Sequence, residues 1–455
     1  MKLKLLCLLL LCFSLIKFSY SQKTRPVLAP GVTAPIGTNN NNSVPFGLAS
    51  CDYNDVRVFP SQNPQSEIHI SINKVNPNVM LLSSNTFPNS FSGVGVWWST
   101  NAGATWAGND YMPNNAQGRA DPSTAFDANG NGYVAVLSSP GGNPFDDPNG
   151  YAIQQTINNG TTWQTQRLGV TNIDCDKDMI AADDVSNSPF ANNLYAVWTN
   201  FGISGGAIQF NSSSNGGVSF STPITLNNNW GQGANVQTGP NGEIYVCWAD
   251  YTNGNFPEQG LGFTSSTNGG GSFTTSRVAF NYTGIRVGNN GNDNFGGTRV
   301  NSFPSMTVDK SSGTRRGRIY VTYAENINGV SVIRIRSSDN QGISWSNANT
   351  ISIGTARQSW FPWISCDATD GNIYIVYYSL DQPSGFQTNT YVAASSDGGL
   401  TFVNQKVSDV SHINSAIQEF GGGYAGDYIG ITAHAGNAYA AWIIEQGNGK
   451  IMCRR

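Results

Sequence analysis

The sequence predicts an all-β protein, a single β-propeller made of four-stranded antiparallel blades. Three observations support this prediction: one turn pattern occurs six times, strand-like runs surround every copy, and the copies are nearly evenly spaced. The copies begin at Ser99, Thr156, Ser213, Ser266, Ser338 and Ser395, at intervals of 57, 57, 53, 72 and 57 residues. Self-similarity at this period indicates a solenoid, a propeller or another modular array.

The repeated pattern reads Ser/Thr-x-Asn/Asp-x-Gly-x-Ser/Thr-Trp/Phe. Asn or Asp close to Gly favours a tight hairpin turn, because these residues tolerate a positive φ. The leading hydroxyl can bond local backbone groups, and the closing aromatic residue supplies a large apolar anchor. These aromatic residues are Trp106, Trp163, Phe220, Phe273, Trp345 and Phe402. Each copy is therefore predicted to be a rigid turn whose ring docks into the core.

Four strand-like runs accompany each copy: two precede it, one leads into it and one follows it. Four antiparallel strands per interval make one propeller blade. After the sixth copy comes a seventh set of strands, GDYIGITA, NAYAAWI and KIMCRR, which lacks its fourth member. We expect the N-terminal segment 44–59 to supply that strand and close a ring of seven blades. A six-bladed ring with one irregular module is the alternative.

Over residues 60–455 the repeat resembles the Asp-box, or bacterial neuraminidase repeat, of the sialidase superfamily. Five copies carry Asn where the family has Asp, and Asp397 alone keeps it. The resemblance implies a propeller that is a sialidase, another glycosidase or a non-catalytic binding protein. The catalytic motif of sialidases is not matched. Such enzymes carry Phe/Tyr-Arg-Ile-Pro at the first strand, whereas the nearest text here, Val56-Arg57-Val58-Phe59-Pro60, has its proline displaced by one residue.

The chain is predicted to have three parts: a signal peptide (1–22), a flexible leader (23–45) and the propeller (46–455). The first part has a basic start, an apolar centre and small residues near its end, which is typical of secretory signals. We therefore expect a secreted, extracellular protein without a membrane span, and a monomer. The formal net charge is −4 and no basic stripe is present, so nucleic acid is not expected as a partner.

Five cysteines follow the signal peptide, namely Cys51, Cys175, Cys247, Cys366 and Cys453. Cys51 and Cys453 lie where the ring should close, and we predict a disulfide between them. No CxxC pair occurs and only three His are present, so a Cys/His metal site is not expected. No cofactor is predicted, although a cluster of carboxylates could hold a structural Ca²⁺.

The turns should all lie on one face of the ring, here called the turn face. The opposite face, here called the loop face, carries the starts of the innermost strands and the loops between second and third strands. Aligning the seven modules at the innermost strand gives a column of residues on the loop face. Its members are Glu67, Asp121, Asp178, Asn235, Phe303, Phe361 and Asp427. Four acids in a protein poor in charge suit the recognition of sugar hydroxyls.

From this column and its neighbours we predict the site. The catalytic candidates are Asp121, Glu67, Tyr428 and Glu419, with a Tyr serving as nucleophile and Glu419 as its helper if the chain is a sialidase. The substrate-binding candidates are Arg119, Arg299, Arg357, Asp178, Asp427 and Trp360. Each residue taken singly could instead cap a strand or pack in the core. The insertion at 278–300, with Arg286, and the connection 138–150 also belong to the loop face.

Three functional hypotheses follow. The first is a secreted propeller that binds or acts on glycans, including a divergent glycoside hydrolase, with a glycan or glycoprotein as partner. The second is an exo-sialidase with relocated residues, which requires three arginines to converge on one anion position. The third is a non-catalytic adhesion or protein-binding propeller. The separation of paired carboxylates would discriminate glycosidase mechanisms.

Overall fold

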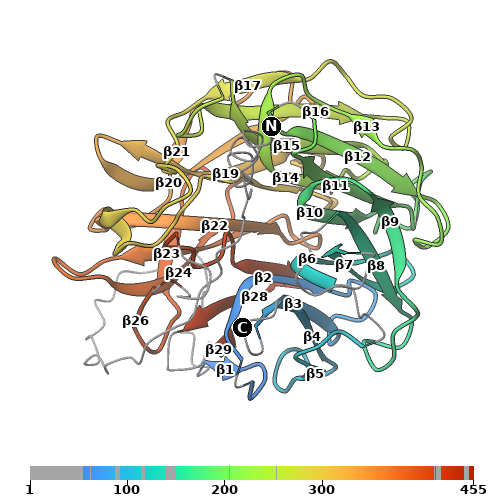
Figure 1. The fold of residues 1–455 in the computed structure, drawn as a ribbon, viewed down its shortest axis with the longest axis horizontal. Coiled ribbons are helices and arrows are strands. Elements are labelled where there is room, and N and C mark those ends of the chain that lie inside the picture. The colour runs from blue at the N-terminus through green and yellow to red at the C-terminus, as the bar shows by residue number, and fades with distance from the viewer. Residues whose placement is uncertain are drawn as a thin grey trace, which may run out of the picture.

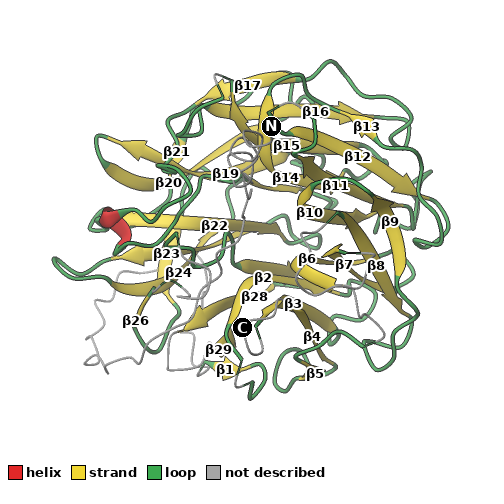
Figure 2. Ribbon diagram, in the orientation of Figure 1, coloured by secondary structure: helices red, strands yellow, loops and turns green. Residues whose placement is uncertain are grey.

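The computed structural model describes residues 55–61, 63–87, 93–113, 118–139, 149–203, 205–252, 254–414, 416, 422–444 and 450–454. Seven antiparallel sheets stand around a central axis as the blades of a propeller (Figure 1). In the described part the chain is strand, turn or loop apart from one short 3₁₀ helix, η2 (Asp293–Phe295) (Figure 2). The predicted all-β class and the seven blades are confirmed, and the six-bladed alternative is wrong.

The first four blades follow the chain from the innermost strand outward. Blade 1 is β2 (Gln65–Ile72), β3 (Met80–Thr86), β4 (Gly93–Ser99) and β5 (Ala107–Asn109); blade 2 is β6 (Gly118–Phe126), β7 (Gly132–Ser138), β8 (Gly150–Thr156) and β9 (Arg167–Thr171). Blade 3 is β10 (Cys175–Ala182), β11 (Leu194–Asn200), β12 (Ala207–Ser213) and β13 (Ile224–Thr225); blade 4 is β14 (Trp230–Thr238), β15 (Ile244–Tyr251), β16 (Gly260–Ser266) and β17 (Arg277–Asn281).

The remaining blades continue in the same sense around the ring. Blade 5 is β18 (Ser305–Val308), β19 (Ile319–Ile327), β20 (Val330–Ser338) and β21 (Asn349–Thr350). Blade 6 is β22 (Gln358–Cys366), β23 (Ile373–Leu380), β24 (Gln387–Ser395) and β25 (Val403–Lys406), with β26 (His412–Ile413) paired to β24. Blade 7 is β27 (Gly430–His434), β28 (Asn437–Ile444), β29 (Lys450–Arg454) and β1 (Val56–Arg57).

Blade 7 is completed by the N-terminal strand, as the sequence predicts. β1 pairs antiparallel with β29, with Val56 opposite Cys453 and Arg57 opposite Met452. This pairing joins the two ends of the propeller and leaves no blade with three strands, which limits exposed sheet edges. The predicted Cys51–Cys453 disulfide stays a prediction, because Cys51 lies outside the described residues.

The middle strands of the blades are buried on both faces, because each blade packs between two others. Every residue of β7 and of β11 is buried, so these strands are almost continuously apolar instead of alternating. Large rings fill the space between blades, and the fully buried ones include Trp97, Trp198, Trp248, Trp360 and Trp442. Burying such rings supplies much of the apolar stabilisation of the ring.

The six repeated turns share one hydrogen-bond pattern and lie between the third and fourth strands of blades 1 to 6. In blade 5, the Ser338 hydroxyl donates to Asn340 Oδ1 (3.0 Å) and accepts from the backbone N–H of Gly342 (2.9 Å). Asn340 Oδ1 in turn accepts from the backbone N–H of Ser344 (2.9 Å). The other five copies repeat these bonds. The polar residues of the repeat therefore serve to hold the turn together.

Replacing Ser338 by Ala should destabilise the fold. Ser338 is buried, and its hydroxyl accepts from the backbone N–H of Gly342. Loss of that acceptor leaves a buried N–H group without a partner, which costs about 1–3 kcal/mol. Urea-induced unfolding measures the change. The exposed Ser312 provides the control, since Ser312→Ala should change the unfolding free energy by less than about 0.5 kcal/mol. Equal effects of the two substitutions would contradict this role of the turn.

Candidate functional site

In five blades the innermost strand has a β-bulge near its start, at the loop face. The first bulged residue has a positive φ in each case: Glu67 (57°), Asp121 (52°), Lys177 (44°), Gly233 (68°) and Phe361 (51°). Bulges re-aim side chains and occur next to functional sites. Positive φ at bulky non-Gly residues is strained and persists only where the surroundings enforce it.

The bulges change the predicted column at two positions. The residues equivalent to Glu67 and Asp121 are Lys177 in blade 3 and Gly233 in blade 4. The sequence alignment placed Asp178 and Asn235 there instead, one and two positions further along. The error arises because an inserted residue shifts the side-chain alternation of a strand, and hydrophobic pattern alone does not reveal it.

Lys177 is the centre of a charge cluster at the loop face. Its side chain is only 3% exposed, and Nζ lies 4.1 Å from the ring centroid of Tyr428 and 5.5 Å from that of Trp363. Burial lowers the pKa of Lys177, and nearby acidic side chains oppose that effect when they are ionised. These acids are Asp121, Glu67, Asp427 and Asp176. A cation of the chain itself therefore sits among the acids that the sequence suggested for a Ca²⁺.

A chain of hydrogen bonds orders the acids of blades 1 and 2. Asn85 Nδ2 donates to Glu67 Oε2 (2.7 Å), and Asn85 Oδ1 accepts from the backbone N–H of Asp121 (2.8 Å). Asp121 Oδ2 accepts from the backbone N–H of Lys177 (3.2 Å). These contacts join three neighbouring blades and hold Glu67 and Asp121, two of the predicted catalytic residues, at the centre of the loop face.

Asp176 is one of two buried acids of this region, with Asp178, whose pKa is raised by burial. Burial and the negative charge of Asp121 raise the pKa of Asp176 to about 8, against the opposing effects of Gln232 and Arg286. Gln232 Nε2 donates to Asp176 Oδ2 at 2.6 Å. Asp176 is thus a buried carboxylic acid beside a negatively charged carboxylate, an arrangement that separates acid and base roles in enzymes.

Arg299 holds Asp427 at the opposite side of the cluster. Its Nη2 donates to Asp427 Oδ2 (2.9 Å), and its guanidinium lies 4.1 Å from the ring centroid of Tyr424. Asn301 Nδ2 also donates to Asp427 Oδ1 (2.8 Å). Both oxygens of Asp427 are therefore occupied, and Arg299 is already engaged by an acid and a ring.

Arg357 lies elsewhere on blade 6, apart from the contacts of Arg299. Its Nε donates to the carbonyl of Gln382 (2.8 Å) and its Nη2 to that of Gly385, in the loop between β23 and β24. Of the third predicted arginine, Arg119, the structure describes the backbone in β6 and not the side chain. Glu419 lies outside the described residues. The convergence of three arginines on one anion therefore stays a prediction.

Two predicted site residues lie in packing positions. The Tyr428 hydroxyl donates to the carbonyl of Pro122 (3.0 Å). Burial and the nearby acids raise the pKa of Tyr428 well above its usual value, the opposite of what an activated nucleophile needs. Trp360 is 1% exposed and its ring lies against Phe295 and Tyr378. In this arrangement neither ring presents a free face to a substrate.

Asp178 has no exposed surface, and neither carboxylate oxygen has a hydrogen-bond partner within the described part of the chain. Burial and the charge of Asp121 raise its pKa well above the usual value. A buried carboxyl group in such surroundings stays protonated. Because Asp178 takes no part in the hydrogen bonds that order Glu67, Asp121 and Asp176, we leave it out of the site proposed below.

Asp178 should make stability fall with rising pH. Because its folded-state pKa lies above the unfolded value of about 3.9, the unfolded chain loses the proton first, so stability drops as pH rises from that value. Asp178→Asn does not titrate. Between about pH 4 and pH 7 the variant should lose at least about 1 kcal/mol less stability than the wild type, as measured by urea unfolding at both pH values.

The exposed Asp293 provides the matched control. Asp293→Asn should follow the wild-type pH dependence, because an exposed carboxylate has nearly the same environment in both states. If Asp178→Asn also followed the wild type, Asp178 would have to be ionised in the folded protein.

The central channel lies between the charge cluster and the turn face. His69 and Trp363, from blades 1 and 6, meet edge to face with centroids 5.4 Å apart. His69 Nδ1 accepts from the backbone N–H of Thr124 (3.0 Å), and burial lowers its pKa to about 3, so the imidazole is neutral. Together with Lys177 and Tyr428, these rings bridge blades across the channel axis.

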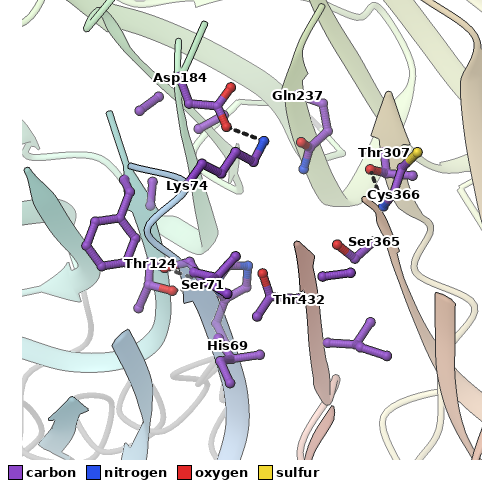
Figure 3. Close-up of a pocket in the computed structure, with 18 of the residues that line it drawn as sticks. His69, Ser71, Lys74, Thr124, Asp184, Gln237, Thr307, Ser365, Cys366 and Thr432 are labelled. Carbon is purple, nitrogen blue, oxygen red and sulfur yellow. Dashed lines mark hydrogen bonds and ion pairs between the residues drawn. The ribbon is translucent and has the colours of Figure 1, made fainter. Parts of the chain in front are cut away.

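Beyond these rings is a polar cavity of about 130 Å³ (Figure 3). Side chains of the innermost strands line it, including Ser71, Gln237, Thr307, Ser365 and Thr432. At its turn-face end Asp184 accepts from Lys74 (2.5 Å) and Lys310 (2.6 Å). A cavity with such a polar lining is expected to hold water.

Within the described ranges, no three His, Cys, Asp or Glu side chains form a group that could hold a metal ion. In the same ranges, no helix has the length and apolar character needed to cross a membrane.

Sequence reasoning found Glu67, Asp121 and Asp427 as candidates. It missed Lys177 and the amides that orient the acids, Asn85 and Gln232. The text Cys175-Asp-Lys-Asp178 offered a signal, since a lysine flanked by acids at a predicted inner strand is unusual in a chain with only 11% charged residues.

The fold is similar to solved propellers of low sequence identity. An ulvan lyase, a polysaccharide lyase solved with a bound GlcA-containing ligand, is 13% identical with a TM-score of 0.52 over 87% of this chain and 95% of its own. The α-L-arabinofuranosidase of Fusarium graminearum is 12% identical (TM-score 0.48; 75% and 97% covered), and the leech intramolecular trans-sialidase 10% (0.47; 77% and 69%). No protein-family model and no curated protein matches the sequence. At these identities the likeness shows the propeller fold alone.

Proposed function

We propose that this protein is a secreted propeller that acts on glycans at the centre of its loop face. One observation carries the proposal: Asp176 and Asp121 are buried acids at the bulges of adjacent innermost strands, and burial together with Asp121 raises the pKa of Asp176 to about 8. A proton donor beside a carboxylate is the arrangement that glycoside hydrolysis uses. We also infer that the six turns are Asp-box repeats, on the basis of their common hydrogen bonds.

In this proposal Asp176 is the general acid. It gives its proton to the glycosidic oxygen as the bond to the anomeric carbon breaks. Asp121 is the general base, taking a proton from the water that attacks that carbon, and Glu67 stabilises the developing positive charge. Asp176 and Asp121 lie on adjacent innermost strands, and the bulges hold both acids near the axis.

The comparisons are consistent with this substrate class without establishing it. The ulvan lyase, the arabinofuranosidase and the trans-sialidase are all enzymes of glycans by their names. The first of them was solved bound to -[GlcA(1-4)Rha3S]-.

A glycan array combined with a hydrolysis panel tests the proposal. The panel includes acidic and neutral polysaccharides and a fluorogenic sialyl substrate. Wild type should cleave at least one glycan, and Asp121→Asn should abolish cleavage. Asp370→Asn, which alters an exposed acid at the turn face, is the matched control and should be active. Binding without turnover would show that the protein is a glycan-binding module and not an enzyme. The absence of both binding and turnover would overturn the proposal.

The exo-sialidase alternative has its own outcome in this panel. It requires release of sialic acid from the fluorogenic substrate and loss of that release in Arg299→Ala. Cleavage of other glycans without sialic acid release would exclude it. Arg299 already forms an ion pair with the carboxylate of Asp427. This favours the general glycan-directed proposal over the exo-sialidase, which needs the arginine for the carboxylate of the sugar.

A further inference from the structure

We propose that Arg286 is a positioning residue for Asp176, acting through the side chain of Gln232, so that the connection between blades 4 and 5 forms part of the site. The inference rests on the proposed role of Asp176 as the acid. It gives a function to the insertion at 278–300, which lies in the long interval between the fourth and fifth repeats. The connection runs from the end of β17 to β18, on the loop face.

The relay consists of two short hydrogen bonds. Arg286 Nη1 donates to Gln232 Oε1 at 2.7 Å, and Gln232 Nε2 donates to Asp176 Oδ2 at 2.6 Å. Arginine has no acceptor, so the amide oxygen of Gln232 must face Arg286. The amide NH₂ must then face Asp176. Arg286 therefore determines which Gln232 group meets the acid.

Arg286 is itself held firmly, as a positioning residue should be. It is 5% exposed, and its guanidinium lies 4.9 Å from the ring centroid of Phe256. Nη2 donates to Asn289 Oδ1 (2.9 Å), Nε to the carbonyl of Gly288 (3.2 Å), and its backbone N–H to Glu258 Oε2 (3.2 Å). These contacts come from blade 4 and from the connection itself.

Glu258 anchors the connection to the loop between β15 and β16. Its Oε1 accepts from the backbone N–H of Ser302 (2.8 Å), while Oε2 accepts from that of Arg286. Further along, the backbone N–H of Arg299 donates to the carbonyl of Gly423, and its side chain reaches Asp427. The connection thus supplies one arginine toward Asp176 and another toward Asp427.

The charge and the hydrogen bond act on Asp176 in the same direction. The amide NH₂ stabilises the ionised carboxylate, and so does the positive charge of Arg286. Removing either should favour the protonated acid. The charged and titratable groups that also face this region are Asp121, Asp427, Glu67, Lys177, Asp178, Asp174 and the Cys175 thiol. None of these residues is substituted in the variants below.

The experiment follows the proton on Asp176 without a substrate. Protein labelled with ¹³C-aspartate is titrated by infrared spectroscopy, and subtraction of the Asp176→Asn spectrum identifies the Asp176 carboxyl band. Arg286→Met should raise its midpoint by about one pH unit. Gln232→Met, which keeps Arg286, should raise it as well. Arg286→Lys keeps the charge and should restore part of the shift.

Arg277→Met, on the outermost strand of the same blade, is the matched control and should leave the midpoint unchanged. A shift in Arg286→Met without one in Gln232→Met would overturn the relay, since the effect would then be charge alone. No shift in either variant would overturn the whole inference.

Activity then separates this inference from the proposed function. With a cleaved glycan, the alkaline limb of the kcat/KM profile should move upward in Arg286→Met by the same amount as the infrared midpoint. If wild type cleaves nothing, the proposed function fails while the infrared titration still decides the relay. A titration shift with an unmoved alkaline limb would show that Asp176 is positioned but is not the acid.

Discussion

Asp176→Asn is expected to lower kcat on a cleaved glycan by about 100- to 10,000-fold, the usual contribution of a general acid. The amide keeps the size of the side chain and the contact with Gln232 but cannot donate an acidic proton. The same role requires wild-type activity to fall as pH rises through about 8, the pKa to which burial and Asp121 raise this carboxyl. Initial rates of wild type and variant across pH 5–10 measure both effects.

A buried acid far from the cluster controls for the loss of a carboxylate as such. Glu243 lies at the turn face of blade 4 and accepts from the backbone N–H of Asn241 (2.8 Å). Glu243→Gln should retain wild-type kcat. Glycans whose leaving group needs no protonation, such as activated aryl glycosides, should be cleaved by Asp176→Asn at nearly the wild-type rate. Equal loss on activated and natural substrates would remove Asp176 from the acid role.

Lys177→Met is expected to destabilise the fold by about 3–5 kcal/mol near pH 7, because it removes the buried cation that faces the carboxylates of Asp121, Glu67 and Asp427. Methionine keeps most of the side-chain volume and the contact with the Tyr428 ring. The loss should shrink near pH 4, where the carboxyl groups can take up protons and the uncompensated charge disappears. Denaturant unfolding at the two pH values measures the difference.

The exposed Lys406 on β25 is the matched control. Lys406→Met should change stability by less than about 0.5 kcal/mol at either pH. A penalty in Lys177→Met that stayed the same from pH 4 to pH 7 would assign Lys177 a packing role over Tyr428 and Trp363. It would then have no electrostatic part in the cluster.

Most of the propeller ring was predictable from short segments of the amino-acid sequence. The turn at Ser338 is determined within eight residues, since its hydroxyl, the Asn340 amide and the Gly342 backbone bond one another. The spacing of six such turns and the unfinished strands after Ser395 were enough to predict seven blades and closure by the N-terminal segment. β1 then pairs with β29 as expected.

The candidate site was predictable only in outline. Glu67 and Asp121 appear at equal positions in successive modules, and both lie at the predicted face. Lys177 could not be placed, because the bulge in β10 inserts a residue that the apolar pattern does not show. Tyr428 and Trp360 looked like site residues because they are aromatic at strand starts, whereas their surroundings are packed.

By itself the sequence determined the class, the blade number and the two faces, because those depend on contacts within one turn or between neighbouring strands. Only the tertiary structure decided which acids share a site, which of them keeps a proton and which cation lies between them. Lys177 meets Tyr428 and Asp427 across about 250 positions of chain, and ring closure brings such groups together. Their pKa values depend on burial and on neighbours from other blades, which no local pattern encodes.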